Sequence, residues 1–277
     1  MPGTEEFRVA IWGARGSVAT PEHGGGRYGG QTPCVEMRCG GKVLVFDAGS
    51  GIRALGRRLA ARGGGDLDVF LGHCHYDHVE GLRFFAPLMD PRFEVRVRSG
   101  HLDGPDATRG IVAGLMRRPF FPVGPEIFRA RTAYVDFAPG DALDLGDGVT
   151  VSTARLSHPG GACGFRIDFG GRSACYLVDH EHGDPTVDAA LETFARGADL
   201  AICDATYCDE DYARHRGFGH SSWQECLRFA ERAGVGRCVL FHHHADADDG
   251  RLDAVAAAAE AMRPGSVVAR EGMELAL

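Results

Sequence analysis

The sequence predicts an α+β fold in which two β-sheets lie between two layers of helices. Each half of the chain contains strand patterns followed by helical patterns, and this order suits a sheet that is covered by helices. A hydrophobic share of 44% over 277 residues is sufficient for a sizeable core. No low-complexity linker separates the halves, so we expect residues 1–277 to form a single domain.

Strand patterns in the first half are short apolar or alternating runs between turn signals. They are predicted at residues 7–12, 34–38, 42–46, 66–71 and 93–97. Gly40-Gly41 separates the second run from the third, which favours a hairpin. Helical spacing of apolar residues predicts helices over residues 52–61 and 107–117, and a short apolar helix or turn over 82–88.

Residues 119–123 read Pro-Phe-Phe-Pro-Val, and the two prolines exclude regular structure there. The aromatic rings and the valine are nevertheless apolar. The segment is therefore expected either to form a lid that lines a pocket or to fill the core beneath a loop, and we favour the core.

The second half is predicted to add more strands and to end with helices. Strands are expected at residues 142–145, 149–156, 164–169, 173–178, 199–203 and 237–241. Helices are expected at residues 191–196, 223–233 and 252–262. Ser221 and Ser222 precede the second of these helices and are candidates for its amino-terminal cap.

The overall charge argues against a polyanionic partner. The formal net charge is −8 and the pI is about 5.9, so no basic field attracts a long nucleic acid. Residues 1–6 lack the basic start and the apolar stretch of a secretory signal. No apolar run reaches the length of about 18 residues that a membrane helix needs. We therefore expect a cytoplasmic protein with no membrane segment.

Cysteine usage indicates buried thiols rather than a disulfide framework. The nine cysteines form no Cys-x-x-Cys pair, and the chain is too long to need covalent staples. A structural metal held by Cys34 with Cys39, or by Cys203 with Cys208, is the alternative for those four residues.

Most of the recognisable chemistry lies in one stretch directly after the strand predicted at residues 66–71. His73, His75, Asp77 and His78 fall within six residues. While the backbone stays extended, His73 and His75 project to the same side and can bind one metal ion. Asp77 and His78 follow after the chain begins to turn, which suits a second ion. Paired metal ions are the usual means of activating a water between them.

The His-x-His-x-Asp-His pattern at residues 73–78 resembles the signature of the metallo-β-lactamase-fold hydrolases. The resemblance implies an αββα sandwich of two mixed sheets between helical layers, with a metal site at one edge. It extends from Trp12 to His242 and so covers nearly the whole chain.

The remaining ligands are expected at three later strand ends. Asp179 follows an apolar strand, and its two carboxylate oxygens suit it to bridge two ions. The resemblance implies that His158 completes the first ion's ligands and that His242 serves the second, with His244 as the alternative to His242. The predicted set is His73, His75 and His158 on one ion, Asp77, His78 and His242 on the other, and Asp179 shared.

The imidazole-rich ligand set suits zinc, with manganese or iron as alternatives. The oxidoreductase branch of this fold carries glutamate where this chain has His75, so the resemblance implies hydrolysis. Asp47 follows the strand predicted at residues 42–46. It is expected either to orient a metal-bound histidine or to cap the helix that follows.

Two further stretches resemble the phosphodiesterase branch, which includes ribonuclease Z and small cyclic-phosphate diesterases. They are Asp204-Ala205-Thr206 and the stretch at residues 219–222, similar to Glu-Ala-Thr and His-Ser-Thr elements of that branch. The resemblance implies that His220 protonates the leaving oxygen and that Asp204 orients it. A helix-capping role for His220 is the alternative. Aspartate in place of glutamate, and Ser222 in place of threonine, depart from the branch pattern.

We therefore expect a dinuclear phosphodiesterase that cleaves a small diester, such as a cyclic nucleotide or cyclic phosphate, through a metal-bridging hydroxide. Its catalytic residues are expected to be Asp77, His220 and Asp204. The chain lacks a recognisable arm of the kind that ribonuclease Z uses to hold transfer RNA, which favours a small substrate over a long nucleic acid. A thioester or lactone hydrolase, or a catalytically silent metal-binding sensor, is the alternative. Relatives often dimerise, which favours a homodimer.

Overall fold

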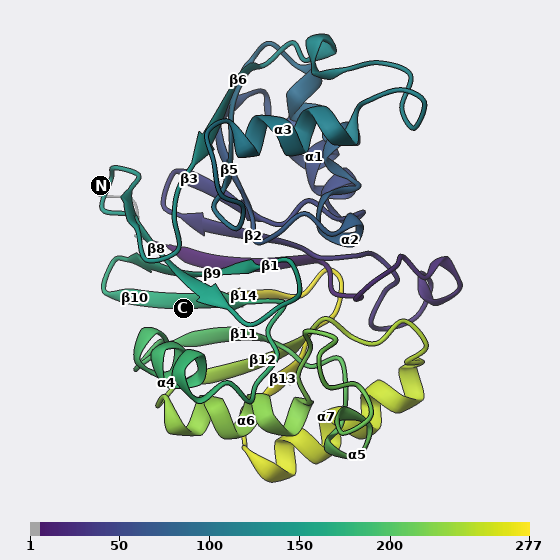
Figure 1. Ribbon diagram of the computed structural model, residues 1–277, viewed down its shortest axis with the longest axis vertical. Coiled ribbons are helices and arrows are strands. Elements are labelled where there is room, and N and C mark those ends of the chain that lie inside the picture. Colours follow the sequence, from purple (N-terminus) through teal and green to yellow (C-terminus); the bar gives the residue numbers. More distant parts are fainter. Residues whose placement is uncertain (1–5) are drawn as a thin grey trace.

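The computed structural model describes residues 6–277. The prediction that residues 1–6 contain no secretory signal therefore falls mostly outside the described residues. The chain forms two seven-stranded sheets that pack face to face, and helices cover the outer face of each sheet (Figure 1). The predicted sandwich of two sheets between helical layers is confirmed.

The first sheet combines the strands of the first half with the last strand of the chain. Its strands are β1 (Phe7–Gly13), β2 (Cys34–Cys39), β3 (Lys42–Phe46), β4 (Gly65–Leu71), β5 (Phe93–Ser99), β6 (Arg131–Asp136) and β14 (Glu274–Ala276). Their order in space is β14-β1-β2-β3-β4-β5-β6. β2 and β3 pair antiparallel, as the predicted hairpin requires, whereas β3 to β6 run parallel. The carboxyl ends of these parallel strands therefore meet at one edge.

The second sheet is built from the second half of the chain. Its strands are β7 (Ala142–Asp144), β8 (Thr150–Leu156), β9 (Ala162–Phe169), β10 (Arg172–Leu177), β11 (Leu200–Asp204), β12 (Arg237–Phe241) and β13 (Val267–Val268). Their order in space is β13-β12-β11-β10-β9-β8-β7, with β10 to β13 parallel and β7 to β10 antiparallel. β8 therefore runs in the same direction as β10, β11 and β12, and these four strands end at the same edge.

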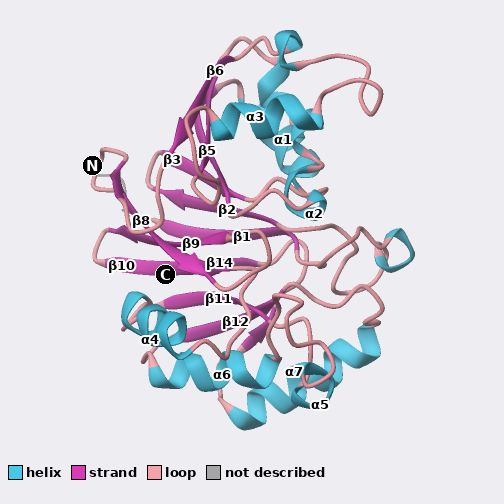
Figure 2. Ribbon diagram, in the orientation of Figure 1, coloured by secondary structure: helices cyan, strands magenta, loops and turns pink. Residues whose placement is uncertain are grey.

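Helices complete the two outer layers (Figure 2). The first sheet carries α1 (Ile52–Arg62), the one-turn α2 (Tyr76–Val79) and α3 (Ala107–Leu115), and the second carries α4 (Pro185–Phe194), α5 (Asp209–Tyr212), α6 (Trp223–Arg232) and α7 (Asp249–Met262). The Ser222 side chain accepts a hydrogen bond from the Glu225 backbone N–H at 3.1 Å, so the predicted cap of α6 is confirmed.

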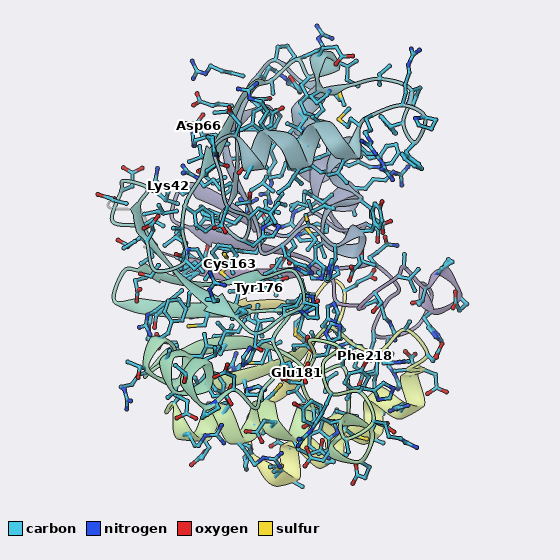
Figure 3. The ribbon with its side chains drawn as sticks, in the orientation of Figure 1. Lys42, Asp66, Cys163, Tyr176, Glu181 and Phe218 are labelled. Carbon is cyan, nitrogen blue, oxygen red and sulfur yellow. The ribbon has the colours of Figure 1, made fainter. Side chains whose placement is uncertain are left out.

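Aromatic side chains fill the space between the sheets. Phe46 from β3 lies 5.3 Å, centroid to centroid, from both Phe70 of β4 and Phe165 of β9. Tyr176 joins this core and lies in the interior (Figure 3). Burying one such ring contributes roughly 1.5–3 kcal/mol to folding. The hydroxyl of Tyr176 donates to Asp47 at 2.7 Å, which links the core to the edge where the strands end.

Some local expectations were wrong or incomplete. Phe120 is 77% exposed, so residues 119–123 do not fill the core as we favoured. The short strands β6, β13 and β14 and the helix α5 were not predicted. Most cysteines are buried, as expected, and within residues 6–277 no group of side chains close enough to bind a metal includes a cysteine. In the same range, none of the helices combines the length and apolar character needed to span a membrane.

Candidate metal centre

The predicted ligands of the first sheet follow β4. His73 is buried, and His75 has extended backbone angles, φ −61° and ψ 149°, at the start of α2. The helical turn then redirects the chain, so that Asp77 and His78 are buried on another side. The sequence prediction depended on this local arrangement, in which His73 and His75 precede the helical turn and Asp77 and His78 lie within it.

The second sheet contributes the other three predicted ligands from three of its strand ends. His158 and Asp179 each lie two residues beyond a strand, β8 and β10 respectively, and His242 follows β12 directly. His242 has a φ of 60°, a left-handed conformation that turns the chain sharply after the strand. Residues up to 169 positions apart in the sequence therefore meet at one edge.

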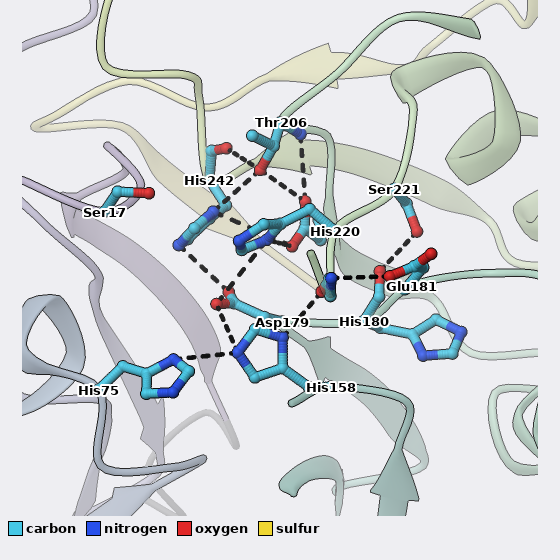
Figure 4. Close-up of polar contacts among 12 residues, drawn as sticks. Ser17, His75, His158, Asp179, His180, Glu181, Thr206, His220, Ser221 and His242 are labelled. Carbon is cyan, nitrogen blue, oxygen red and sulfur yellow. Dashed lines mark hydrogen bonds and ion pairs between the residues drawn. The ribbon is translucent and has the colours of Figure 1, made fainter. Parts of the chain in front are cut away.

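Asp179 lies at the centre of these side chains (Figure 4). Its Oδ2 is 3.7 Å from Nε2 of His73 and 3.7 Å from Nε2 of His158. The same oxygen is 3.4 Å from Nε2 of His78. Its Oδ1 is 3.2 Å from Nε2 of His242. The carboxylate of Asp179 thus reaches imidazoles of both predicted ligand groups.

The structure brings all seven predicted ligands together, with six of them in two groups and Asp179 close to members of both. Within each group the donor atoms lie within 4.8 Å of one another, and the groups are His73, His75 and His158, and Asp77, His78 and His242. In the first group Nε2 of His158 is 3.1 Å from Nδ1 of His75. In the second group Nε2 of His242 is 3.3 Å from Oδ2 of Asp77. These are spacings at which side chains surround an ion.

Unpartnered polar atoms indicate that the cluster fits metal ions. Both ring nitrogens of His73 and Oδ1 of Asp179 are buried and have no hydrogen-bond partner within the described residues. A buried polar atom without a partner is costly, and coordination of a cation removes that cost. Burial, followed by the neighbouring His78, lowers the pKa of His73 well below its ordinary value. Its ring is therefore neutral, the form that binds metals.

The charge around His78 also favours a cation. Burial opposes protonation of His78, yet Asp77, Asp179 and Asp47 together raise its pKa well above its ordinary value. His78 and His242 in turn hold the pKa of Asp77 below its usual range, although burial acts in the opposite direction. The cluster therefore concentrates buried carboxylates whose charge a divalent ion would neutralise.

Asp47 contacts the cluster instead of capping α1. Its Oδ2 lies 2.6 Å from Nδ1 of His78, and its Oδ1 accepts the backbone N–H of Gly72 at 2.8 Å. The residue at the amino-terminal cap of α1 is Gly51. Of the two roles expected for Asp47, its geometry matches the orientation of a histidine.

His220 stands beside the cluster with Asp204 behind it. Nδ1 of His220 is 2.7 Å from Oδ2 of Asp204, and the ring stacks at 4.9 Å on that of His242. Burial lowers the pKa of His220, but Asp204 and Asp179 outweigh burial and raise it to about 9. The ring of His220 is therefore cationic and lies beside the predicted ligands. The direct hydrogen bond with Asp204 leaves no space for an ion between the two residues.

Two residues that support this arrangement were missed at the sequence level. The Thr206 hydroxyl lies 3.0 Å from Nδ1 of His242 and 2.8 Å from Oδ1 of Asp204. The Glu181 carboxylate accepts the backbone N–H groups of Gly217 and Gly219, each at 2.7 Å. In the sequence, Thr206 was considered only as part of a motif. Glu181 accepts hydrogen bonds from backbone N–H groups about 36 residues away, and residue types do not reveal such a contact.

His244, the alternative to His242, lies away from the cluster. Its side chain is 38% exposed, and its Nδ1 accepts the backbone N–H of Asp246 at 3.2 Å. Neither of the two ligand groups includes it. The structure therefore brings His242, and not His244, to the predicted ligands.

Comparison with known proteins identifies the family. A family model described as a beta-lactamase superfamily domain matches residues 42–243, most of the chain. Among curated proteins, the ribonuclease Z of Bradyrhizobium sp. (strain ORS 278) is 28% identical over 265 residues. That alignment covers 76% of this chain and 83% of the relative. The resemblance drawn from the motifs is confirmed.

Solved structures show the same fold. The metallo-beta-lactamase fold protein YhfI from Bacillus subtilis superposes with a TM-score of 0.74 at 21% identity, covering 99% of this chain and 100% of that chain. A diphosphatase from the PhnP family superposes with a TM-score of 0.72 at 18% identity, covering 98% of this chain and 97% of that chain. The predicted fold class is confirmed.

Proposed function

The chain belongs to the beta-lactamase superfamily, and from that premise we propose that this metal-dependent hydrolase is a dinuclear phosphodiesterase that acts on small diesters. The position of Asp179 carries the proposal. One carboxylate lies between two groups of ligand-type side chains, each of which can hold one ion. That arrangement suits a pair of ions that share a ligand.

We assign the residues as follows. One ion is held by His73, His75 and His158, the other by Asp77, His78 and His242, and Asp179 contacts both. When bound, two divalent ions, with zinc best suited to this imidazole-rich set, polarise a phosphoryl oxygen and lower the pKa of a water. The buried carboxylates and the imidazoles would fix the positions of the ions.

His220 supplies the proton in this proposal. Its Nδ1 is held by Asp204, so Nε2 is the nitrogen available to donate to a departing oxygen. The raised pKa of about 9 keeps the ring protonated at neutral pH. Asp204 holds the ring in place and balances its charge. Such a donor is needed most when the leaving group is a basic alkoxide.

The names of similar proteins support hydrolysis of a bond to phosphorus. The chain is similar to proteins named ribonuclease Z and to a diphosphatase. The net charge of −8 favours a small diester over a long polyanion, because a negative field repels such a partner. RNA is the second candidate substrate, favoured by the ribonuclease Z relatives.

The test is a parallel assay of the metal-loaded protein. Bis(p-nitrophenyl) phosphate, a thioester, a lactone and a precursor transfer RNA are offered with zinc and with manganese. We expect diester turnover that the Asp77→Ala variant lacks. Diester turnover equal to that of this variant would contradict the proposal. Preferential cleavage of the thioester or lactone would reassign the bond, and preferential cleavage of the RNA would reassign the substrate.

A further inference from the structure

Two glycines in α3 have no role in packing. Gly110 and Gly114 lie four residues apart and so share a face of the helix. Neither has a left-handed backbone, and a Cβ atom added at either position would meet no atom within 4 Å. Glycine in a helix interior is destabilising relative to alanine because it loses more conformational freedom on folding. Neither backbone geometry nor contact explains why these positions lack a side chain.

The glycine face borders a cavity of about 540 Å³. Cys74 and Tyr76 of the predicted metal-binding stretch also line the cavity, and the segment after α3 adds Arg117 and Phe120. In Figure 1 the segment after α3 extends as a long loop on the right of the molecule, the side on which α2 also lies. A larger side chain at either glycine would occupy this space. The absence of side chains at positions 110 and 114 therefore keeps the cavity open.

Two exposed aromatic side chains line the cavity. Tyr76 is 78% exposed and Phe120 is 77% exposed, and large aromatic side chains are usually far more buried than this. The residue after Phe120 is held in place by Arg83. The guanidinium of Arg83 lies 5.5 Å from the ring of Phe84 and 5.3 Å from that of Phe121. An exposed ring on an anchored segment can stack with a flat ligand at little cost in conformational entropy.

The cavity adjoins the mouth of the metal centre. His75 is the exposed member of the predicted ligand set, so the centre opens to solvent beside it. The two neighbours of His75 in the chain, Cys74 and Tyr76, line the cavity. A substituent that extends from a phosphate at the centre past His75 can therefore reach the cavity. Two cations, Arg83 and Arg117, against one carboxylate, Glu80, suit an anionic ester.

We propose that this cavity binds the planar aromatic substituent of the phosphoester substrate, a nucleobase or an aryl ring, between Tyr76, Phe120 and the glycine face of α3. The inference deepens the proposed phosphodiesterase function and rests on it. Stacking of a base on an aromatic side chain changes affinity by roughly 5- to 150-fold. The cavity is therefore expected to select aromatic over alkyl esters by at least about fivefold.

The test is calorimetric binding of phenyl phosphate and methyl phosphate to the zinc-loaded protein. These ligands share the phosphate and differ in the ring. We expect phenyl phosphate to bind at least about fivefold more tightly to the wild type. In Gly114→Leu, where the new side chain fills the cavity, the two affinities become equal and the melting temperature does not fall. Phe120→Ala reduces the preference without filling the cavity.

Gly250→Leu is the matched control, because Gly250 is an exposed helical glycine in α7 on the other sheet. It should keep the wild-type preference. Equal affinities in the wild type, or an unchanged preference in Gly114→Leu, would overturn the cavity assignment. Absence of diester turnover alongside a clear ring preference would overturn the proposed function and leave an aromatic phosphate site. The two failures are therefore distinguishable.

Discussion

Nδ1 of His78 lies 2.6 Å from Oδ2 of Asp47, and both side chains are fully buried. This contact engages one ring nitrogen of His78 and leaves Nε2 directed at Asp77 and Asp179, at 3.2 and 3.4 Å. Asp47 therefore orients the proposed ligand His78 and is not itself a ligand. The same carboxylate also bonds to Gly72 and Tyr176, so it ties the metal centre to the core.

Replacing Asp47 should weaken metal binding. Asp47→Ala removes the partner that orients His78, and losses of this kind reduce metal affinity by about 10- to 100-fold. Competition for zinc against a chromogenic chelator measures the change. Asp68→Ala is the matched control, since Asp68 is a buried carboxylate on β4 that pairs with Arg96 and Arg98. Equal zinc affinities of the two variants would contradict the orienting role.

Replacing His220 should affect chemistry rather than metal content. His220→Ala is expected to reduce turnover of diesters with alkoxide leaving groups by about 10²–10⁴-fold, because these groups need a proton. Turnover of bis(p-nitrophenyl) phosphate, whose leaving group departs as a stable anion, should fall less. Metal analysis should find the wild-type content. A variant that instead loses an ion would show that His220 is a ligand.

Glu181 should affect both stability and turnover because it holds the loop that precedes His220. Its carboxylate accepts two backbone N–H groups, and the carbonyl of Gly219 in turn lies 2.8 Å from Nδ1 of His158. Hydrogen bonds to a charged group contribute about 1.5–3 kcal/mol each, so Glu181→Ala should lower the free energy of unfolding by roughly 2 kcal/mol or more. It should also lower kcat because His220 follows this loop. Chemical denaturation and steady-state kinetics measure the two effects.

The control for Glu181 is Glu231→Ala, which removes a side chain that is 79% exposed on α6. Exposed ion pairs contribute little, so stability and kcat should stay close to the wild type. A Glu181→Ala variant that matches this control in both measurements would contradict the role of the carboxylate in holding the loop.

Metal removal should destabilise the protein, and the stability that zinc restores should show whether His242 or His244 is a ligand. An ion present at about a thousand times its dissociation constant stabilises the folded state by about 4 kcal/mol, which raises the melting temperature by on the order of 10 °C. Zinc added after chelation should restore this increment in the wild type and in His244→Ala. His242→Ala should show a smaller increment. The opposite result for the two histidines would reverse their assignment.

Much of the fold was predictable because strands that pack on both faces are apolar. The hairpin of β2 and β3 and the buried β12 were found from short apolar runs and glycine turns. β6 was missed because it is an edge strand with a mixed pattern, Arg131–Asp136, and few buried residues. β13 and β14 have two and three residues and depend on neighbouring strands for their conformation.

The candidate site was predictable to the extent that residue type marks it. Histidines and acids directly after apolar strands indicated the positions of His73, Asp179 and His242, and the structure places them together. Glu181 was not found because its partners are backbone N–H groups, which every residue except proline carries. Phe120 was misassigned because an apolar side chain gives no sequence signal of whether it is buried or exposed.

The sheets share the proposed coordination sphere unequally, with four side chains following β4 and three coming from the ends of β8, β10 and β12. A polypeptide divided between β6 and β7 would leave each fragment with an incomplete set of donors. Neither fragment alone should retain ions through gel filtration, whereas a reassociated pair should recover them. Ion retention is thereby a direct reporter of fragment complementation, and it requires no substrate.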